Sequence, residues 1–141
     1  MKYLLDTNVL SELAKVAPNE NVIRTFRQNI YDCATCATVL QELIYGCERL
    51  PEGKRKTSIH KNIENFRIHL QIYPYDSLAA KICGDLLAKC EKIGRTSPYD
   101  DTQIAATALA NNLILVTRNT ADFTAIQSVS NLQLENWWEE R

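Results

Sequence analysis

Acidic side chains stand near the ends of predicted strands in three separate parts of the 141-residue chain. Asp6 ends the first apolar run, Glu42 lies in the first turn of a helix after the second predicted strand, and Asp101 opens a later helix. Asn119 and Asp122 follow the strand that comes after that helix. Because ligands of open parallel sheets bind beyond the carboxyl ends of the strands, we expect these five residues at one rim of a sheet.

Clustered carboxylates repel one another and resist ionising together, and a divalent cation removes that repulsion. Magnesium prefers oxygen ligands and keeps several waters, so a few carboxylates suffice to hold it. The bound ion polarises a phosphoryl oxygen and lowers the pKa of a bound water. The pattern therefore predicts a magnesium- or manganese-dependent site for cleaving phosphodiester bonds. No histidine or cysteine in the sequence is placed to replace the ion.

Two adjacent acids, Asp100 and Asp101, compete for the position on the later helix. Asp101 shares a helical face with Ile104 and Ala105, which predicts a buried position. Asp100 falls toward Gln103 and suits the positive N-terminal end of the helix. Since an acid on a buried face needs a partner, we assign Asp101 to the metal and Asp100 to the helix end.

Each of these polar residues also has a purely structural interpretation when it is taken alone. Asp6 could cap the helix that follows it, and Glu42 could be a solvated helix residue. Asp122 could cap a short turn, and Asn119 could simply make a turn after the strand. The joint placement of all of them at one predicted sheet edge is what favours chemistry.

The elements that must position these residues alternate between short apolar strands and longer amphipathic helices. Strands separated by helices predict a parallel sheet covered on both faces, which is a three-layer α/β/α sandwich with a mostly parallel central sheet. The predicted strands are Lys2–Leu5, Cys33–Ala37, Ile72–Pro74, Leu113–Thr117 and Leu132–Leu134. One predicted helix follows the first strand and ends at Ala14. The other predicted helices span Val22–Gln28, Val39–Arg49, Lys54–Leu70, Ser77–Ile93 and Pro98–Asn111.

Three polar residues are predicted to cap these helices. Thr38 with Gln41 three residues on forms a capping box, and Asp76 precedes the Ser77 helix. Ser97 is the expected cap of the last of these helices, with a proline in its first turn. Gly94 is expected to end the Ser77 helix.

Composition and cysteine usage predict a cytoplasmic protein with a single domain over residues 1–141. Hydrophobic residues make up 45% and charged residues 23% of the chain. Neither a signal peptide nor an apolar run of membrane-spanning length is recognisable. Cys33 and Cys36 would point to opposite faces of a strand and could not grip one ion, so we expect all five cysteines to be free, buried thiols.

Six basic residues gather in one stretch in the middle of the chain, although the net charge is only −1. It is equally consistent with a solvated helix face and with a patch that binds RNA phosphates or an acidic partner. Arg118, just past the late strand, would act closer to the scissile phosphate. The stretch comprises Arg49, Lys54, Arg55, Lys56, Lys61 and Arg67.

Four sequence blocks, in this order and at these separations, resemble the PIN-domain family and in particular the VapC-type toxins of bacterial toxin–antitoxin pairs. The resemblance extends from residue 2 to about residue 138. The blocks are Tyr3–Leu10, Glu42 at a helix start, Asp101–Ala108, and Val116–Asn119 followed by Asp122 and Phe123.

The resemblance implies an endoribonuclease that depends on magnesium or manganese. Asp6, Glu42 and Asp101 match the three core acids of the family, and Asp122 matches a fourth, more variable one. Thr7 and Asn119 match polar residues around the site. The implied partners are an RNA substrate, a cognate antitoxin whose C-terminal peptide blocks the site, and a second copy of the chain.

For the homodimer, we expect the interface to use the Lys54–Leu70 helix and an apolar surface beside it. That surface is formed by Val22, Ile23 and Phe26 on one short helix, with Tyr31 just beyond. It offers more apolar area than a short outer helix needs.

Two other protein classes also place an acid after the first strand, and both would use Asp6 as a phosphorylated residue. A haloacid-dehalogenase-type phosphoryl-transfer enzyme needs a second Asp two residues on, where this chain has Asn8. A receiver domain needs an acidic pair near the first strand and a Lys after the last, where this chain has Arg118 after Thr117. Stable phosphorylation by acetyl phosphate would favour either class over a nuclease.

Overall fold

The computed structural model describes residues 1–139 and contains a five-stranded, fully parallel sheet. The strand order is β3-β2-β1-β4-β5. The first strand therefore lies at the centre, with β2 and β3 on one side and β4 and β5 on the other. The parallel α/β prediction is therefore confirmed. The strands are β1 (Tyr3–Leu5), β2 (Cys33–Cys36), β3 (Gln71–Tyr73), β4 (Ile114–Val116) and β5 (Leu134–Glu135).

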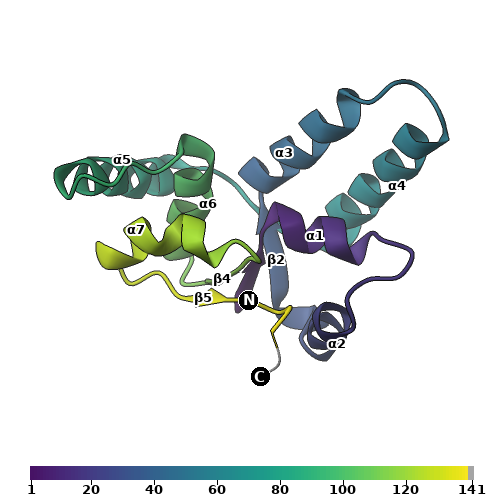
Figure 1. Cartoon of the computed structure of the whole chain (residues 1–141), viewed down its shortest axis with the longest axis horizontal. Coiled ribbons are helices and arrows are strands. Elements are labelled where there is room, and N and C mark those ends of the chain that lie inside the picture. The colour runs from purple at the N-terminus through teal and green to yellow at the C-terminus, as the bar shows by residue number, and fades with distance from the viewer. Residues whose placement is uncertain (140–141) are drawn as a thin grey trace.

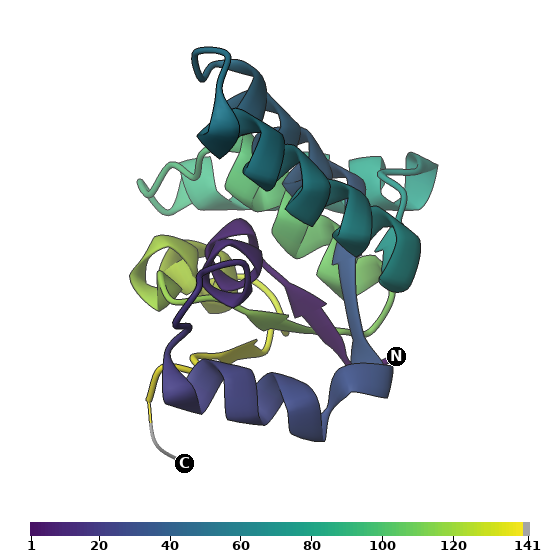
Figure 2. The same ribbon diagram turned by 90° about the vertical axis from the view of Figure 1, so that its right-hand side faces the viewer.

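Helices lie on both sides of this sheet, which gives the expected three layers. Figure 2 shows α2 on one side of the strands and the group α3 to α6 on the other. In Figure 1, α3 and α4 form a hairpin that projects away from α5 and α6. The helices are α1 (Thr7–Leu13), α2 (Glu20–Gln28), α3 (Ala37–Glu48), α4 (Lys54–His69), α5 (Ser77–Lys92), α6 (Tyr99–Ala110) and α7 (Thr124–Ser128).

The hydrophobic core is centred on the two middle strands. Leu4 and Leu5 of β1 and Leu115 of β4 are fully buried, as expected for parallel strands covered on both faces. Trp137, from near the end of the chain, is also fully buried and packs edge-on against Tyr3, with ring centroids 5.3 Å apart. The C-terminal segment therefore completes the core beneath the first strand.

One of the three predicted helix caps is confirmed and two are wrong. Asp76 accepts a hydrogen bond from the Ala79 N–H at 3.0 Å and caps α5. The helix α3 begins directly at the end of β2 with Cys36 as its N-cap, so Thr38 already lies inside the helix. Pro98 is the N-cap of α6, because the hydroxyl of Ser97 is hydrogen-bonded to that of Thr102 at 2.7 Å instead.

One strand prediction was also misplaced. The second strand begins at Cys33 as predicted, after a 3-10 turn over Ile30–Asp32, and ends one residue early at Cys36. The last strand is shifted along the chain and pairs with β4 only over Leu134–Glu135. Gly94, with a φ of +72°, ends α5 as predicted, since this left-handed conformation suits glycine.

The apolar side of α2 is used by the core and does not form the free surface that the sequence suggested. Val22 is fully buried, and Phe26 packs against the core cluster. Only Tyr31, beyond the helix, stays 92% exposed. The expected contribution of this helix to a dimer interface was therefore wrong for Val22, which has no exposed surface, whereas Phe26 is partly buried.

All five cysteines are free and buried, as predicted. Among residues 1–139, no helix combines the length and the apolar character needed to cross a membrane.

Candidate active site

Asp6 lies at the carboxyl end of β1, where its carboxylate is held from two sides. The Thr7 N–H donates to Oδ1 at 2.8 Å, and the hydroxyl of Thr117 donates to Oδ2 at 2.9 Å. Asp6 is also the N-cap of α1, so the capping role considered from the sequence is real and coexists with the placement at the rim. Burial raises the pKa of Asp6, while these two hydrogen bonds lower it.

Glu42 reaches the same rim from the second turn of α3. The hydroxyl of Thr7 donates to its Oε2 at 2.6 Å, so Thr7 ties the two acids together. The other oxygen, Oε1, is buried and has no hydrogen-bond partner among residues 1–139. Burial raises the pKa of Glu42, and the neighbouring carboxyl of Asp100 raises it further.

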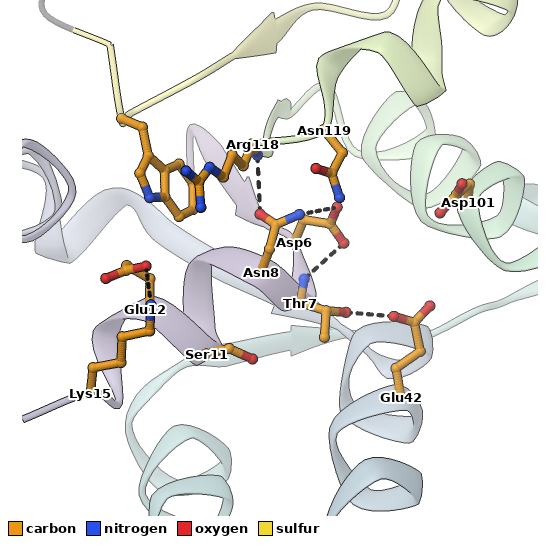
Figure 3. Close-up of a pocket in the computed structure, with 11 residues that line it drawn as sticks. Asp6, Thr7, Asn8, Ser11, Glu12, Lys15, Glu42, Asp101, Arg118 and Asn119 are labelled. Atoms are coloured by element: carbon orange, nitrogen blue, oxygen red, sulfur yellow. Dashed lines mark hydrogen bonds and ion pairs between the residues drawn. The ribbon is translucent and has the colours of Figure 1, made fainter. Parts of the chain in front are cut away.

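Asp101 closes the third side of the rim from the first turn of α6. Figure 3 shows Asp6, Glu42 and Asp101 placed around one open space, each coming from a different element. Burial raises the pKa of Asp101 to about 7, and the negative charges of Asp100, Asp6, Asp122 and Glu42 add to this effect. Three separate elements thus hold these three acids close enough together to repel one another.

Asp100 does not turn away from the acids, as its helical face had suggested. Its carboxyl interacts with that of Glu42 and raises the pKa of Glu42. The helix α6 has no side-chain cap, so Asp100 does not act as one. The face argument holds for burial, because Asp101 is partly buried and lines the cleft while Asp100 is exposed. It did not predict that Asp100, in the same first turn, also influences Glu42.

Asp122 is separated from Glu42 by Asp101. It lies in the 3-10 turn Thr120–Phe123 and shares with Asp101 a neighbouring depression of about 320 Å³. Its charge raises the pKa of both Asp6 and Asp101, so it is electrostatically part of the same group.

Two residues that organise the site were not singled out as site residues from the sequence. The buried hydroxyl of Thr117 donates to Asp6 and accepts from the Asn8 amide and the Asn119 N–H, each at 3.1 Å. Asn8 in turn accepts the Arg118 N–H at 3.1 Å. The available signal was position, since Thr117 follows the end of β4 at the rim that Asp6 occupies.

Arg118 lies beside the rim, but its side chain does not point at the acids. Figure 3 shows the Arg118 side chain running away from Asp6. Its Cζ lies 5.3 Å from the centre of the Trp138 ring. Asn119 lines the cleft on the other side of Asp6. The cleft has a volume of about 440 Å³ and also contacts Ser11, Glu12 and Lys15.

The donors of the rim fit a hard divalent cation. They are carboxylate oxygens, one of them buried without a partner, and among residues 1–139 no Lys or Arg forms an ion pair with them. In the same part of the chain, no three His, Cys, Asp or Glu side chains are close enough to hold an ion by themselves. Waters must complete the coordination, which is how proteins usually hold magnesium.

Residues 3–128 match the family model described as the PIN domain. The chain belongs to the PIN-domain family. It is 33% identical over 140 residues to the VapC ribonuclease Y4jK of Sinorhizobium fredii, covering 96% of this chain and 97% of that protein. It is 34% identical over 126 residues to Toxin FitB of Neisseria gonorrhoeae, covering 86% of this chain and 91% of that one. The crystal structure of FitAcB from Neisseria gonorrhoeae superposes with a TM-score of 0.86 at 30% identity, covering 98% of this chain and 99% of that one.

Membership of the PIN-domain family confirms the resemblance drawn from the four sequence blocks. The family match includes the first strand with Asp6 and extends through α7, so it contains each of the rim acids.

Proposed function

We propose that the protein is a metal-dependent endoribonuclease and the toxin of a bacterial toxin–antitoxin pair. The observation that carries this proposal is the group of mutually repelling acids around one open cleft, within a PIN domain. Relatives named as a ribonuclease and as a toxin, similar over most of their length, support the choice of RNA as substrate. We propose residues 1–141 as one nuclease domain.

Asp6, Glu42 and Asp101 are the proposed metal-binding and catalytic acids, with Asp122 as a fourth. PIN-domain nucleases generally depend on a divalent metal ion, and we propose Mg²⁺ or Mn²⁺ because the donors are oxygen atoms. When bound, the ion supplies the charge that activates water and polarises the scissile phosphate.

The neighbouring side chains fix the geometry of these acids. Thr117 and the Thr7 N–H each occupy one oxygen of Asp6, so this carboxylate has a single orientation. The hydroxyl of Thr7 does the same for Oε2 of Glu42 and leaves Oε1 free for a cation. Such outer hydrogen bonds orient ligands and tune their basicity.

The resemblance to VapC-type toxins further supports a cognate antitoxin, a homodimer and a cytoplasmic location. For the dimer, the exposed apolar residues of α3 and α5 are better candidates than α2, because the core leaves them uncovered. They are Ile44 and Tyr45 on α3 and Leu78 on α5.

Incubation of the purified protein with bacterial RNA, followed by sequencing of the new RNA ends, tests this function. We expect defined cleavage sites with Mg²⁺ or Mn²⁺, none with EDTA, and none with Asp6→Asn. Undiminished cleavage in EDTA would contradict the metal role. Stable labelling of Asp6 by acetyl phosphate without RNA cleavage would instead support a phospho-acceptor domain.

A further inference from the structure

The wall of the active cleft opposite Asp101 carries a flat, positively charged pair of side chains. Arg118 lies over the indole ring of Trp138, and both line the cleft that contains the rim acids. Figure 3 shows Arg118 on one side of Asp6 and Asp101 on the other. An RNA strand that places a phosphate at the acids therefore has a neighbouring nucleotide at the pair.

The guanidinium of Arg118 is not used by the fold. Among residues 1–139 it forms no ion pair and no hydrogen bond, although its backbone N–H is fixed by Asn8. The residue is exposed. The exposed guanidinium, held near the ring, is therefore available to a ligand that enters the cleft.

Trp138 is a rigid support for that guanidinium. Its backbone N–H donates to Asn136 Oδ1 at 2.9 Å, and its backbone carbonyl accepts from the Asn21 side chain at 3.1 Å. Lys15, the Asn19 N–H and the Trp138 indole all lower the pKa of Glu12, which lies along the same wall. Residue 138 is therefore anchored through both polar groups of its backbone.

We propose that the Arg118–Trp138 pair is a stacking platform for an unpaired nucleobase next to the scissile phosphate. This inference rests on the proposed ribonuclease function and specifies its substrate as single-stranded RNA. Proteins that bind such RNA stack bases on aromatic rings and on arginine planes. Phosphate attraction alone needs only the charge of Arg118, whereas stacking needs its planar shape as well.

The test compares two probes of equal backbone charge, an RNA hexamer of adenosines and an abasic hexamer. Both carry a fluorophore at the 5′ end and are titrated with the Asp6→Asn variant and Mg²⁺, so that no cleavage occurs. Fluorescence anisotropy gives the affinity of each hexamer, and the quenching of tryptophan fluorescence is recorded in parallel. Stacking of one base is worth roughly fivefold or more in affinity. We therefore expect the adenosine hexamer to bind at least about fivefold more tightly than the abasic one and to quench Trp138.

Two further variants separate stacking from charge and from structure. Arg118→Lys keeps the charge but loses the plane, and Trp138→Leu keeps apolar volume but loses the ring. We expect each to reduce the difference between the two probes to less than twofold, while Tyr31→Ala, an exposed aromatic at the other end of the sheet, leaves it unchanged. Circular dichroism verifies that each variant is folded.

Equal binding of the two probes to the parent variant would overturn the proposal, as would an unchanged probe difference in a folded Arg118→Lys variant. Cleavage of RNA by the wild-type protein in that case would show that the ribonuclease function stands and only the platform fails. Absence of cleavage by the wild type would reject the function itself.

Discussion

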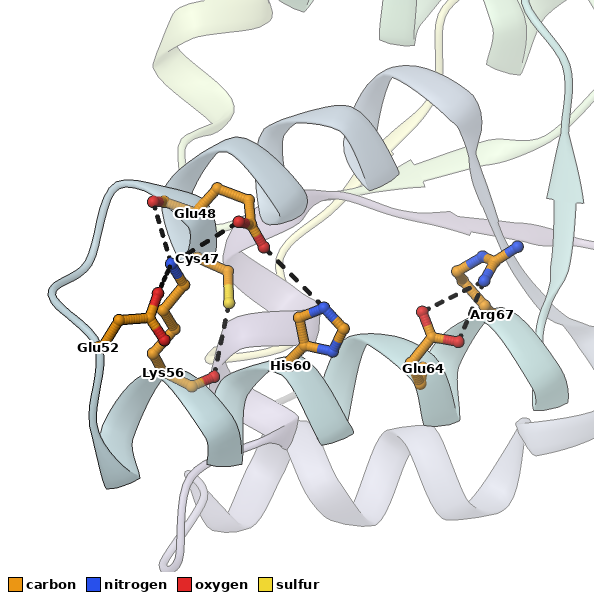
Figure 4. A network of polar contacts seen from close by, with 7 residues as sticks. All are labelled: Cys47, Glu48, Glu52, Lys56, His60, Glu64 and Arg67. Carbon is orange, nitrogen blue, oxygen red and sulfur yellow. Dashed lines mark hydrogen bonds and ion pairs between the residues drawn. The ribbon is translucent and has the colours of Figure 1, made fainter.

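Charged side chains are arranged in opposite ways at the catalytic rim and on the α3–α4 hairpin. On the hairpin, Lys56 lies 2.8 Å from Glu52 and 3.7 Å from Glu48, and Arg67 lies 3.0 Å from Glu64. Figure 4 shows these acids and bases interleaved along the two helices. At the rim, acids face acids, and no Lys or Arg within residues 1–139 is paired with them.

The pKa values follow this difference. Lys56 lowers the pKa of Glu52, whereas burial and four neighbouring acids raise the pKa of Asp101 to about 7. Paired surface charges contribute little to stability, but repelling buried ones cost free energy in the absence of a cation. The contrast is consistent with hairpin charges that serve solubility and local structure, and it supports the proposed metal-binding role of the rim acids.

The largest expected effect comes from neutralising one acid in each region. Asp6→Asn and Asp101→Asn keep the side-chain shape but remove a charge, so we expect kcat/KM for RNA cleavage to fall at least roughly 100-fold. Glu64→Gln on α4 removes a paired acid and should leave cleavage unchanged. Initial rates on one RNA substrate provide the measurement, and comparable losses in all three variants would invalidate the contrast.

Asp100→Asn is expected to have an intermediate effect. The helical face suggested little loss, but Asp100 lies against Glu42 and influences its ionisation. Loss of such a neighbour commonly reduces metal affinity or activity by about tenfold or more. In a titration of the cleavage rate against Mg²⁺ concentration, the variant should need more Mg²⁺ than the wild type to reach half of its maximal rate. If the variant cleaves as fast as the wild type at every Mg²⁺ concentration, Asp100 acts only at the helix end, as the sequence suggested.

A rise in pH is expected to lower the stability of the metal-free protein and to raise the rate of metal-dependent cleavage. The pKa of Asp101 rises from 3.8 to about 7 on folding, so its contribution to stability is present below pH 3.8 and is lost as the pH rises through 7. At pH 8 without metal, Asp101→Asn should therefore stabilise the protein, by about 1–2 kcal/mol after allowance for its partial exposure.

Cleavage should show the reverse trend, because metal binding needs the ionised acids. We expect the rate to fall as the pH drops below about 7. Thermal unfolding with EDTA at pH 5 and pH 8 measures the stability difference, and pH–rate profiles measure the activity. A less stable Asp101→Asn variant at pH 8 would mean that repulsion at the rim is absent.

The smallest expected effect belongs to the basic stretch. Changing Lys54, Arg55 and Lys56 together to Ala should weaken RNA binding and flatten its salt dependence, with turnover at saturating RNA little changed. Each lost phosphate contact lowers the slope of log K against log salt by about 0.7 for single-stranded RNA. Since Lys56 is already paired with two acids, Lys56→Ala alone is the matched control and should leave the slope unchanged. An unchanged slope in the triple variant would mean that the hairpin is only a solvated face.

The position of the rim could be predicted from the sequence because it depends on topology alone. Asp6, Glu42 and Asp101 each follow a strand or open a helix, and parallel strands bring such positions to one edge. The role of each residue within the rim could not be predicted in this way. Helical period does separate the exposed Asp100 from the partly buried Asp101, but the influence of Asp100 on Glu42 depends on how α6 packs against α3.

The wrong helix caps have a related cause. Thr38 and Ser97 have the preferred cap chemistry, but β2 leads directly into α3 and the hydroxyl of Ser97 is bound to Thr102. Short-range preference was overridden by the chain's path into each helix. The apolar face of α2 was misjudged for the same reason, since nothing local to Val22 and Phe26 indicates that the core covers them.

The position of the two tryptophans in the sequence has a consequence for synthesis on the ribosome. Every acid of the rim has been translated by residue 122, yet the core beneath β1 and the wall of the cleft wait for Trp137 and Trp138. A nascent chain of 130 residues would carry all the catalytic groups without the segment that pairs with β4 and seals the core. The order of translation thus delays completion of the core and of the cleft wall until the last strand has emerged.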